Sequence, residues 1–241
     1  MKKLVCVLAC LMVVCISNLA TAAVLEVPGD YTTIQDAINA ASNGDIIYVS
    51  GGPYPENILI DGVDITLRAV GDVEIQGATN SYGNKTIAIY NSTCTIDGFT
   101  VKHNGSAIYA RGMASNGEGE VHVIIKNCYV TDYIKNGITV NGELATGFVK
   151  NNTIVSDADS VYAQNGIQFG YGATGKAHDN TVDTDWYLGE DWTASGILIF
   201  EADGVSVKKN SISDAQTGIA IETWGWVCQF QVDQLREEYA P

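Results

Sequence analysis

A short pattern that ends in Val or Ile recurs along this chain at steps of 22 to 30 residues. A second pattern, which begins with Gly-Ile in its clearest copies, lies between the copies of the first. The first pattern occupies 97–101, 126–130, 150–154, 178–182 and 208–212, and the second occupies 107–110, 137–140, 166–169, 196–199 and 218–221. A repeat of this length cannot bury its apolar face alone, so the pattern predicts a solenoid in which each copy forms one turn.

Alignment of the copies produces columns of apolar residues that we expect to stack inside the solenoid. The three columns are Ile96, Ile125, Val149, Ala177 and Val207; Val101, Val130, Ile154, Val182 and Ile212; and Ile108, Ile138, Ile167, Ile197 and Ile219. Strand alternation then places the neighbouring polar positions outside, and these are Asp97, Lys126, Lys150, His178 and Lys208.

A polar column holds Asn152, Asn180 and Asn210 at the same place in three successive copies. We expect these side chains to stack at a tight turn, where their amides can satisfy backbone groups that would otherwise lack a partner. The three asparagines are therefore assigned a structural role.

A helix is predicted at 33–41, ahead of the repeats. Ile34, Ala37, Ile38 and Ala41 form one apolar stripe, and Thr32 with Gln35 has the spacing of a capping box. A helix with a single apolar stripe must lay it on something, and we expect this one to cover the open end of the solenoid.

These features together resemble the right-handed parallel β-helix proteins of the pectate-lyase-like superfamily, over roughly 24–224. The resemblance rests on Thr-Ile-Gln-Asp-Ala-Ile-Asn at 33–39, on Gly-Pro-Tyr-Pro-Glu-Asn at 52–57 and on the two repeats. It implies an all-β, single-stranded right-handed solenoid of about seven coils with an N-terminal capping helix. The catalytic motifs of pectin methylesterases, polygalacturonases and alginate epimerases have no counterpart, so Tyr54 and Glu56 are predicted to be structural.

The first 22 residues have the features of a secretory signal peptide. Two lysines precede an apolar run at 4–16, and Ala-Thr-Ala at 20–22 has the spacing of a cleavage site. An uncleaved anchor is the alternative, although the run is short for a bilayer span. We expect a secreted protein, extracellular, periplasmic or at the cell surface, with no membrane span after removal of the signal.

The β-helix domain is predicted over 23–224, and 225–241 forms a tail. The tail is either a C-terminal cap or the end of a truncated reading frame. Three cysteines follow the signal (Cys94, Cys128 and Cys228), and an odd number argues against a disulfide framework. The domain must then be held by burial and hydrogen bonds, and we expect a monomer.

The charge balance is strongly acidic, with 13 basic and 28 acidic residues and a net charge of −15. Without Lys2 and Lys3 the balance is 11 against 28, or −17. Such a surface repels nucleic acid and anionic lipid, and it suits divalent cations or a basic partner. Solubility alone is the simpler explanation.

The loop at 183–193 is rich in carboxylates and aromatic rings, and coil stacking places it beside 156–162. Carboxylates act as acid and base in glycoside cleavage, and aromatic rings stack on sugars. The catalytic candidates are Asp183, Asp185, Glu190 and Asp191, and the substrate-binding candidates are Asp157, Asp159, Tyr162, Trp186, Tyr187 and Trp192. The alternative is a loop that only covers the flank of the solenoid.

No cofactor is required by these motifs, although Asp157, Asp183 and Asp185 offer oxygen ligands that suit Ca²⁺. A lyase would need a basic residue, for which Arg111, Lys126, Lys150 and Lys208 are candidates; solvation and charge balance are the simpler explanation of the lysines.

The prediction is a secreted protein that binds an extracellular acidic polysaccharide. Cleavage by a lyase or hydrolase mechanism is left open. The alternative is a non-catalytic surface or adhesion module.

Overall fold

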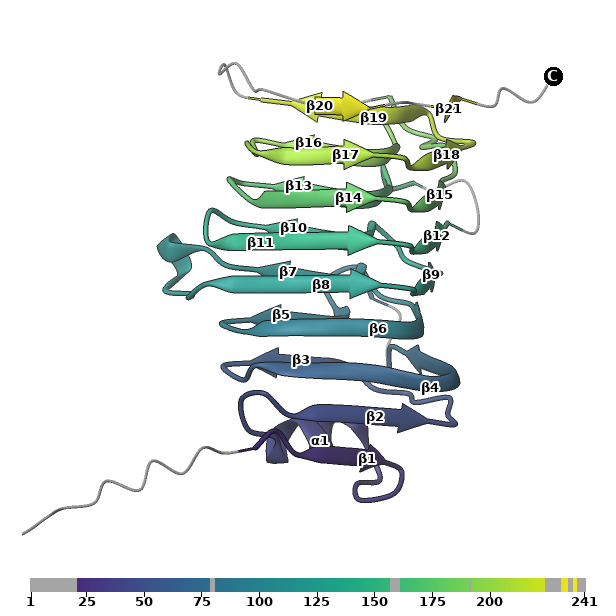
Figure 1. Ribbon diagram of the computed structural model, residues 1–241. Coiled ribbons are helices and arrows are strands. Elements are labelled where there is room, and N and C mark those ends of the chain that lie inside the picture. Colours follow the sequence, from purple (N-terminus) through teal and green to yellow (C-terminus); the bar gives the residue numbers. More distant parts are fainter. Residues whose placement is uncertain are drawn as a thin grey trace, which may run out of the picture.

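The computed structural model describes residues 21–78, 81–156, 161–190 and 192–223, together with the backbone of 231–233 and 236–237. Within this part of the chain, successive turns of parallel strands lie one above another, from the N-terminal turn beside helix α1 to the C-terminal turn (Figure 1). The predicted β-helix architecture is confirmed.

One of the two sheets, sheet B, takes one strand from each turn. Its seven parallel strands agree with the expected number of coils. In spatial order they are β3 (Ile58–Asp61), β5 (Lys85–Tyr90), β7 (Ser106–Arg111), β10 (Asn136–Asn141), β13 (Asn165–Gly170), β16 (Ser195–Phe200) and β19 (Thr217–Glu222).

The other sheet, sheet A, wraps around the rest of each turn. It begins with β1 (Val24–Val27), β2 (Ile46–Ser50), β4 (Ile65–Gln76) and β6 (Thr93–Lys102). Beyond β6 each turn contributes two shorter strands: β8 (Val121–Lys126) and β9 (Tyr129–Thr131); β11 (Ala145–Lys150) and β12 (Thr153–Val155); β14 (Thr174–His178) and β15 (Thr181–Asp183); β17 (Val205–Lys208) and β18 (Ser211–Ser213); β20 (Gln231–Asp233) and β21 (Arg236–Glu237).

The core consists of columns of β-branched side chains in register between strands. One column runs through all seven strands of sheet B: Ile58, Ile87, Ile108, Ile138, Ile167, Ile197 and Ile219. All but Ile219 are buried, and each buried isoleucine contributes about 1.5–3 kcal/mol by leaving water. The other two apolar columns expected from the repeats are also in register, on the strands of sheet A. The isoleucine column extends two coils further toward the N-terminus than predicted.

A sharp corner, here named the Asn corner, separates the two strands that each later turn gives to sheet A. One residue of each turn has a left-handed backbone there, with φ of +56° at Asn127, +53° at Asn151, +56° at Asp179 and +55° at Lys209. The predicted asparagine stack follows immediately. Side-chain Oδ1 of Asn180 accepts from the backbone N–H and the side-chain amide of Asn152, both at 3.0 Å.

The same pattern repeats one turn later. Oδ1 of Asn210 accepts from the backbone N–H and side-chain amide of Asn180, at 3.0 and 2.9 Å. The side-chain amide of Asn180 also donates to the carbonyl of Val149 at 3.0 Å. The stack therefore satisfies buried backbone groups that the corner takes out of the sheet.

One outer position departs from the prediction. Asp97 is only 9% exposed, because its carboxylate accepts from Arg68 at 3.0 Å, from Lys126 at 3.2 Å and from the side chain of Asn127 at 2.8 Å. Charged partners from two adjacent turns cover it, so it is an enclosed ion-pair centre and not a solvated residue.

Helix α1 (Ile34–Ala40) lies across the N-terminal end, with Ile34, Ala37 and Ile38 buried (Figure 1). Its N-cap is Thr33, whose hydroxyl accepts from the N–H of Asp36 at 3.1 Å, so the predicted box on Thr32 was one residue early. The carboxylate of Glu56 accepts from the N–H groups of Ile34 and Gln35, both at 3.0 Å. Glu56 therefore has a structural role at the helix start. A 3₁₀ turn, η1 (Ala114–Asn116), lies in one loop.

The ends of the chain are described only in part. Residues 1–20 lie outside the described part, so the signal peptide remains a prediction. Of the predicted tail, only the backbones of β20 and β21 are described, and these strands pair with β17 and β18. Among the described residues, no helix has the length and apolarity needed to cross a membrane. Cys94 and Cys128 are buried free thiols, and Cys228 lies outside the described residues.

Candidate functional site

A groove of about 720 Å³, here named the aromatic groove, lies on the outer face of sheet B toward its C-terminal end. Strands β13, β16 and β19 form its floor, and loops from several turns form its walls. The lining residues are Tyr82, Lys135, Val161, Tyr162, Ala163, Asn165, Gln168, Tyr171, Tyr187, Trp192, Thr193, Leu198, Phe200, Glu222 and Thr223.

The groove is rich in aromatic rings. The rings of Tyr82 and Tyr162 lie 4.7 Å apart at 31°, and those of Tyr171 and Phe200 lie 5.2 Å apart, edge to face. Trp192 is 65% exposed, an unusual position for so large an apolar side chain. Exposed rings of this kind offer flat apolar surfaces with a polar edge, which suits the faces of sugar rings.

The floor carries a row of carboxamides in fixed orientations. The side chain of Asn165 donates to Oδ1 of Asn136 at 3.0 Å, and the side chain of Gln168 donates to Oδ1 of Asn141 at 3.1 Å. All four are largely buried; Asn165 and Gln168 line the groove, and Asn136 and Asn141 hold them from the neighbouring strand β10. The hydroxyl of Thr139, in register with Gln168, is buried and has no hydrogen-bond partner in the described part of the chain. The groove therefore combines apolar walls with preoriented polar groups, as ligand sites do.

Among the described residues, one cation and one carboxylate line the groove. The ammonium of Lys135 donates to the carbonyl oxygen of Ala163. Burial lowers the pKa of Lys135, and the negative charge of Glu222 opposes this by raising it. A partly desolvated amine near a carboxylate can bind an anionic group, and an amine with a lowered pKa is also better suited to take a proton.

The loop that carries Tyr187 and Trp192 is held by the next turn. Oε1 of Gln216 accepts from the N–H of Tyr187 at 3.2 Å and from the N–H of Ala194 at 3.0 Å. One side chain thus ties two points of the 184–194 loop together and holds its aromatic residues beside sheet B.

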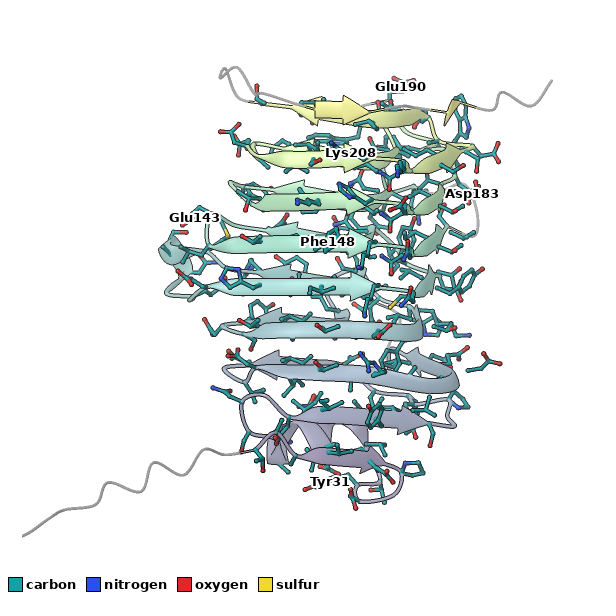
Figure 2. All side chains as sticks on the ribbon, viewed as in Figure 1. Tyr31, Glu143, Phe148, Asp183, Glu190 and Lys208 are labelled. Atoms are coloured by element: carbon teal, nitrogen blue, oxygen red, sulfur yellow. The ribbon has the colours of Figure 1, made fainter. Side chains whose placement is uncertain are left out.

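Only some of the predicted site residues line the aromatic groove. Tyr162, Tyr187 and Trp192 line the groove, whereas Asp183, Asp185, Glu190 and Trp186 are not among its lining residues. Asp157, Asp159 and Asp191 lie outside the described residues. Figure 2 shows Asp183 near the short strands of sheet A and Glu190 by the C-terminal turn. The catalytic and binding roles assigned to these residues remain predictions.

Asp183 and Asp185 belong to an acidic flank instead. The hydroxyl of Ser156 donates to Asp185 at 3.2 Å and accepts from its N–H at 2.6 Å, so the two loops do meet as coil stacking predicted. Burial raises the pKa of Asp183, and the charges of Asp214 and Asp185 raise it further, against a hydrogen bond from Ser213 that lowers it. In the described part of the chain, no group of three or more His, Cys, Asp or Glu is placed to hold a metal ion. The Ca²⁺ site remains a prediction.

Two of the candidate bases are occupied in ion pairs. The guanidinium of Arg111 pairs with Glu118 and lies 5.3 Å from the ring centre of Tyr90. Lys126 pairs with Asp97. Both are tied into the outer surface of the sheets and away from the aromatic groove.

Several groove residues were not predicted from the sequence because they are spread over several turns, with at most three in any one. They are Tyr82, Lys135, Asn165, Gln168, Tyr171, Leu198, Phe200 and Glu222. Strand alternation could have found four of them. In each Gly-Ile repeat the residues one and three positions after the buried isoleucine face outward, and these positions include Gln168, Leu198, Phe200 and Glu222.

Comparison with known proteins identifies the repeats. The family model described as "Right handed beta helix region" matches residues 85–233, more than half of the chain. A curated relative, a cell surface glycoprotein of Methanothermus fervidus, is 32% identical over 114 residues, which are 45% of this chain and 19% of that protein. The chain therefore spans about a fifth of the length of this relative. A pectin methylesterase from Aspergillus niger, solved in deglycosylated form, has a TM-score of 0.42 and 14% identity over 88% of this chain and 86% of its own.

Proposed function

We propose that this chain, which belongs to the right-handed β-helix family, binds an extracellular polysaccharide in the aromatic groove. The observation that carries the proposal is the combination of exposed rings in the walls with oriented carboxamides in the floor. A sugar ring has an apolar face and a rim of hydroxyls, and the two parts of the groove match these two chemistries.

A surface location supports the same proposal. The Methanothermus fervidus relative is a cell surface glycoprotein, and the first residues of this chain have the pattern of a secretion signal. A solenoid suits this setting because its stacked turns present long grooves parallel to the axis, which fit a linear polymer.

A pair of tryptophans tests the proposal. Trp192 lines the groove, whereas Trp186 is 55% exposed and does not. Purified protein is screened against neutral and acidic polysaccharides, and the best ligand is measured by calorimetry. Trp192→Ala should weaken binding roughly tenfold, since a lost ring contact costs about 1–1.5 kcal/mol, and Trp186→Ala should leave the affinity unchanged. Equal losses in both variants, or none in either, would contradict the proposal.

Cleavage is a second candidate, favoured by Lys135. An amine with a lowered pKa is a suitable base for eliminating a uronate glycosidic bond, and it lies in the groove itself. New reducing ends with the ultraviolet absorbance of unsaturated uronates, lost in Lys135→Gln and kept in Lys85→Gln, would identify a lyase. Reducing ends without that absorbance would indicate a hydrolase and direct attention to Glu222 and the acidic flank. Binding without new ends would leave a binding module.

A further inference from the structure

A second depression, of about 530 Å³, lies on the outer face of sheet A. It runs along the solenoid axis and crosses β4, β6, β8, β11 and β14. Its floor is one register column, in which Thr66, Thr95, Ile124, Phe148 and Lys176 follow one another on adjacent strands. With strands spaced about 4.8 Å apart, the column is about 19 Å long. We name this depression the axial trough.

The axial trough has a polar side and two ends of opposite charge. Thr93, His122 and Thr146 line one side, and the hydroxyl of Thr146 lies 2.9 Å from that of Thr174. Asp64 stands at the N-terminal end. Lys176 stands at the C-terminal end, so the trough leads from a carboxylate toward a group of lysines.

That group, the lysine cluster, consists of Lys150, Lys176, Lys208 and Lys209. Lys150 and Lys208 are the register neighbours of His178 on either side, and Lys176 precedes His178 by two residues on the same face of β14. The ammonium of Lys150 lies 5.0 Å from the ring centre of Phe148, and the ring of His178 meets Phe148 edge to face. Figure 2 shows Phe148 and Lys208 over the same face of the stack.

Ion pairs do not account for Lys150, Lys176 and Lys209. They do account for Arg68 and Lys126, which pair with Asp97. Within the described part of the chain, none of the ion pairs involves Lys150, Lys176 or Lys209. A local group of cations on a chain of net charge −15 persists because screening limits the reach of distant carboxylates to about 8–10 Å.

The titration of His178 agrees with a positive local potential. Burial lowers its pKa, and the charges of Lys176, Lys208 and Lys209 lower it further, while the neighbouring Asp179 raises it. The protonated imidazole is therefore disfavoured in the space above the cluster, where an anion would be favoured.

We propose that the axial trough and the lysine cluster form a second binding surface, separate from the aromatic groove, for a linear glycan that carries carboxylate groups. The sugar rings lie over Ile124 and Phe148, and the carboxylates face Lys150, Lys176 and Lys208. A concave trough fits a chain better than a flat membrane, and hydroxyls beside the half-buried ring of Phe148 match a polymer that bears both hydroxyls and charge.

The test uses two soluble cellulose derivatives that differ in charge. Carboxymethyl cellulose should bind, and neutral hydroxyethyl cellulose should not. Lys150→Gln with Lys176→Gln should weaken binding to carboxymethyl cellulose about tenfold, since each exposed contact contributes up to about 1 kcal/mol. Lys85→Gln with Lys102→Gln removes the same charge from other surfaces and should have little effect, and so should Trp192→Ala. Salt at about 1 M should abolish binding.

A second readout is the pKa of His178, followed by NMR. Bound carboxylates should raise it, because they offset the lysine charges. The proposal fails if the pKa does not move, if both double variants lose affinity equally, or if the two celluloses bind alike. If single-stranded DNA binds with equal affinity, the surface recognises polyanions in general and the proposal of a glycan ligand is wrong. Circular dichroism establishes that each variant is folded.

Discussion

Two neighbouring bends of each coil, the Asn corner and the passage from sheet A to sheet B, differ in how much they vary. At the Asn corner every later turn makes the same bend with one left-handed residue and a buried polar stack. The passage from sheet A to sheet B follows after one short strand, and its loops range in length from three residues at 214–216 to eleven at 184–194. A corner that holds the register allows these loops to change length without disturbing the core, so the invariant corner gives stability and the variable loops give a binding surface.

Loss of the Asn corner should have the largest effect. Asn180→Ala leaves the N–H of Asn152 and the carbonyl of Val149 without these bonds in a buried place, and Oδ1 of Asn210 keeps only one of its two donors from residue 180. Each unsatisfied group costs about 1–3 kcal/mol, so we expect a loss of about 3–5 kcal/mol in the free energy of unfolding. Urea denaturation measures it, with the surface variant Asn116→Ala as control. A loss below about 1 kcal/mol would show that the corner does not hold the register.

The groove should behave in the opposite way. Trp192→Ala, which removes a 65% exposed ring, should change the free energy of unfolding by less than about 0.5 kcal/mol. The same urea titration measures this. A drop as large as that of the corner variant would mean that the ring of Trp192 holds its loop against the solenoid, and the contrast between the Asn corner and the variable loops would fail.

Gln216 joins two successive variable loops, and its loss should have an intermediate effect on the longer of them. Gln216→Ala removes the acceptor shared by the N–H groups of Tyr187 and Ala194, at a cost of about 1 kcal/mol. We expect faster hydrogen exchange in 184–194 and weaker glycan binding, with the rest of the solenoid unchanged. Gln216→Glu keeps an acceptor oxygen and should restore most of both. Exchange that rises throughout the molecule would contradict a local role.

The smallest expected effect concerns pH. The folded-state pKa of Asp183 is raised, so the folded chain holds this proton more tightly than the unfolded chain, and stability falls as pH rises from the unfolded pKa through the folded one. Asp183→Asn should therefore raise the free energy of unfolding near pH 7, by about 0.5 kcal/mol or less because solvent screens the site, and should have no effect near pH 3. Thermal melts at both pH values measure it. Destabilisation at pH 7 would mean that the carboxylate makes a favourable contact.

Most of the fold could be predicted from the repeats, because the residues of one column occupy equivalent positions in successive turns and must have similar size and polarity. Stacked isoleucines and asparagines occupy the same place in every turn, so several copies support one inference. The N-cap at Thr33 was missed by one residue because Glu56, 22 positions after Ile34, helps to fix the helix start. The burial of Asp97 was missed for a similar reason, since Arg68 and Lys126 come from neighbouring turns.

The candidate site was predicted less well because it does not repeat. The long loop at 183–193 correctly drew attention to Tyr187 and Trp192, whereas its carboxylates lie outside the groove lining. Lys135, Gln168 and Glu222 come from three different turns, and each is an ordinary polar residue in its own segment. Only the register of sheet B brings them together.

The helix at the N-terminal end has one further consequence. Sheet B would begin with an open edge at β3, yet the side-chain amide of Gln35 donates to the carbonyl of Leu59 at 3.0 Å and accepts from its N–H at 2.7 Å. One side chain thus makes both bonds that an added strand would make at this position. Another chain that reached this edge would have to displace that amide first, so the helix protects the molecule against aggregation through this edge.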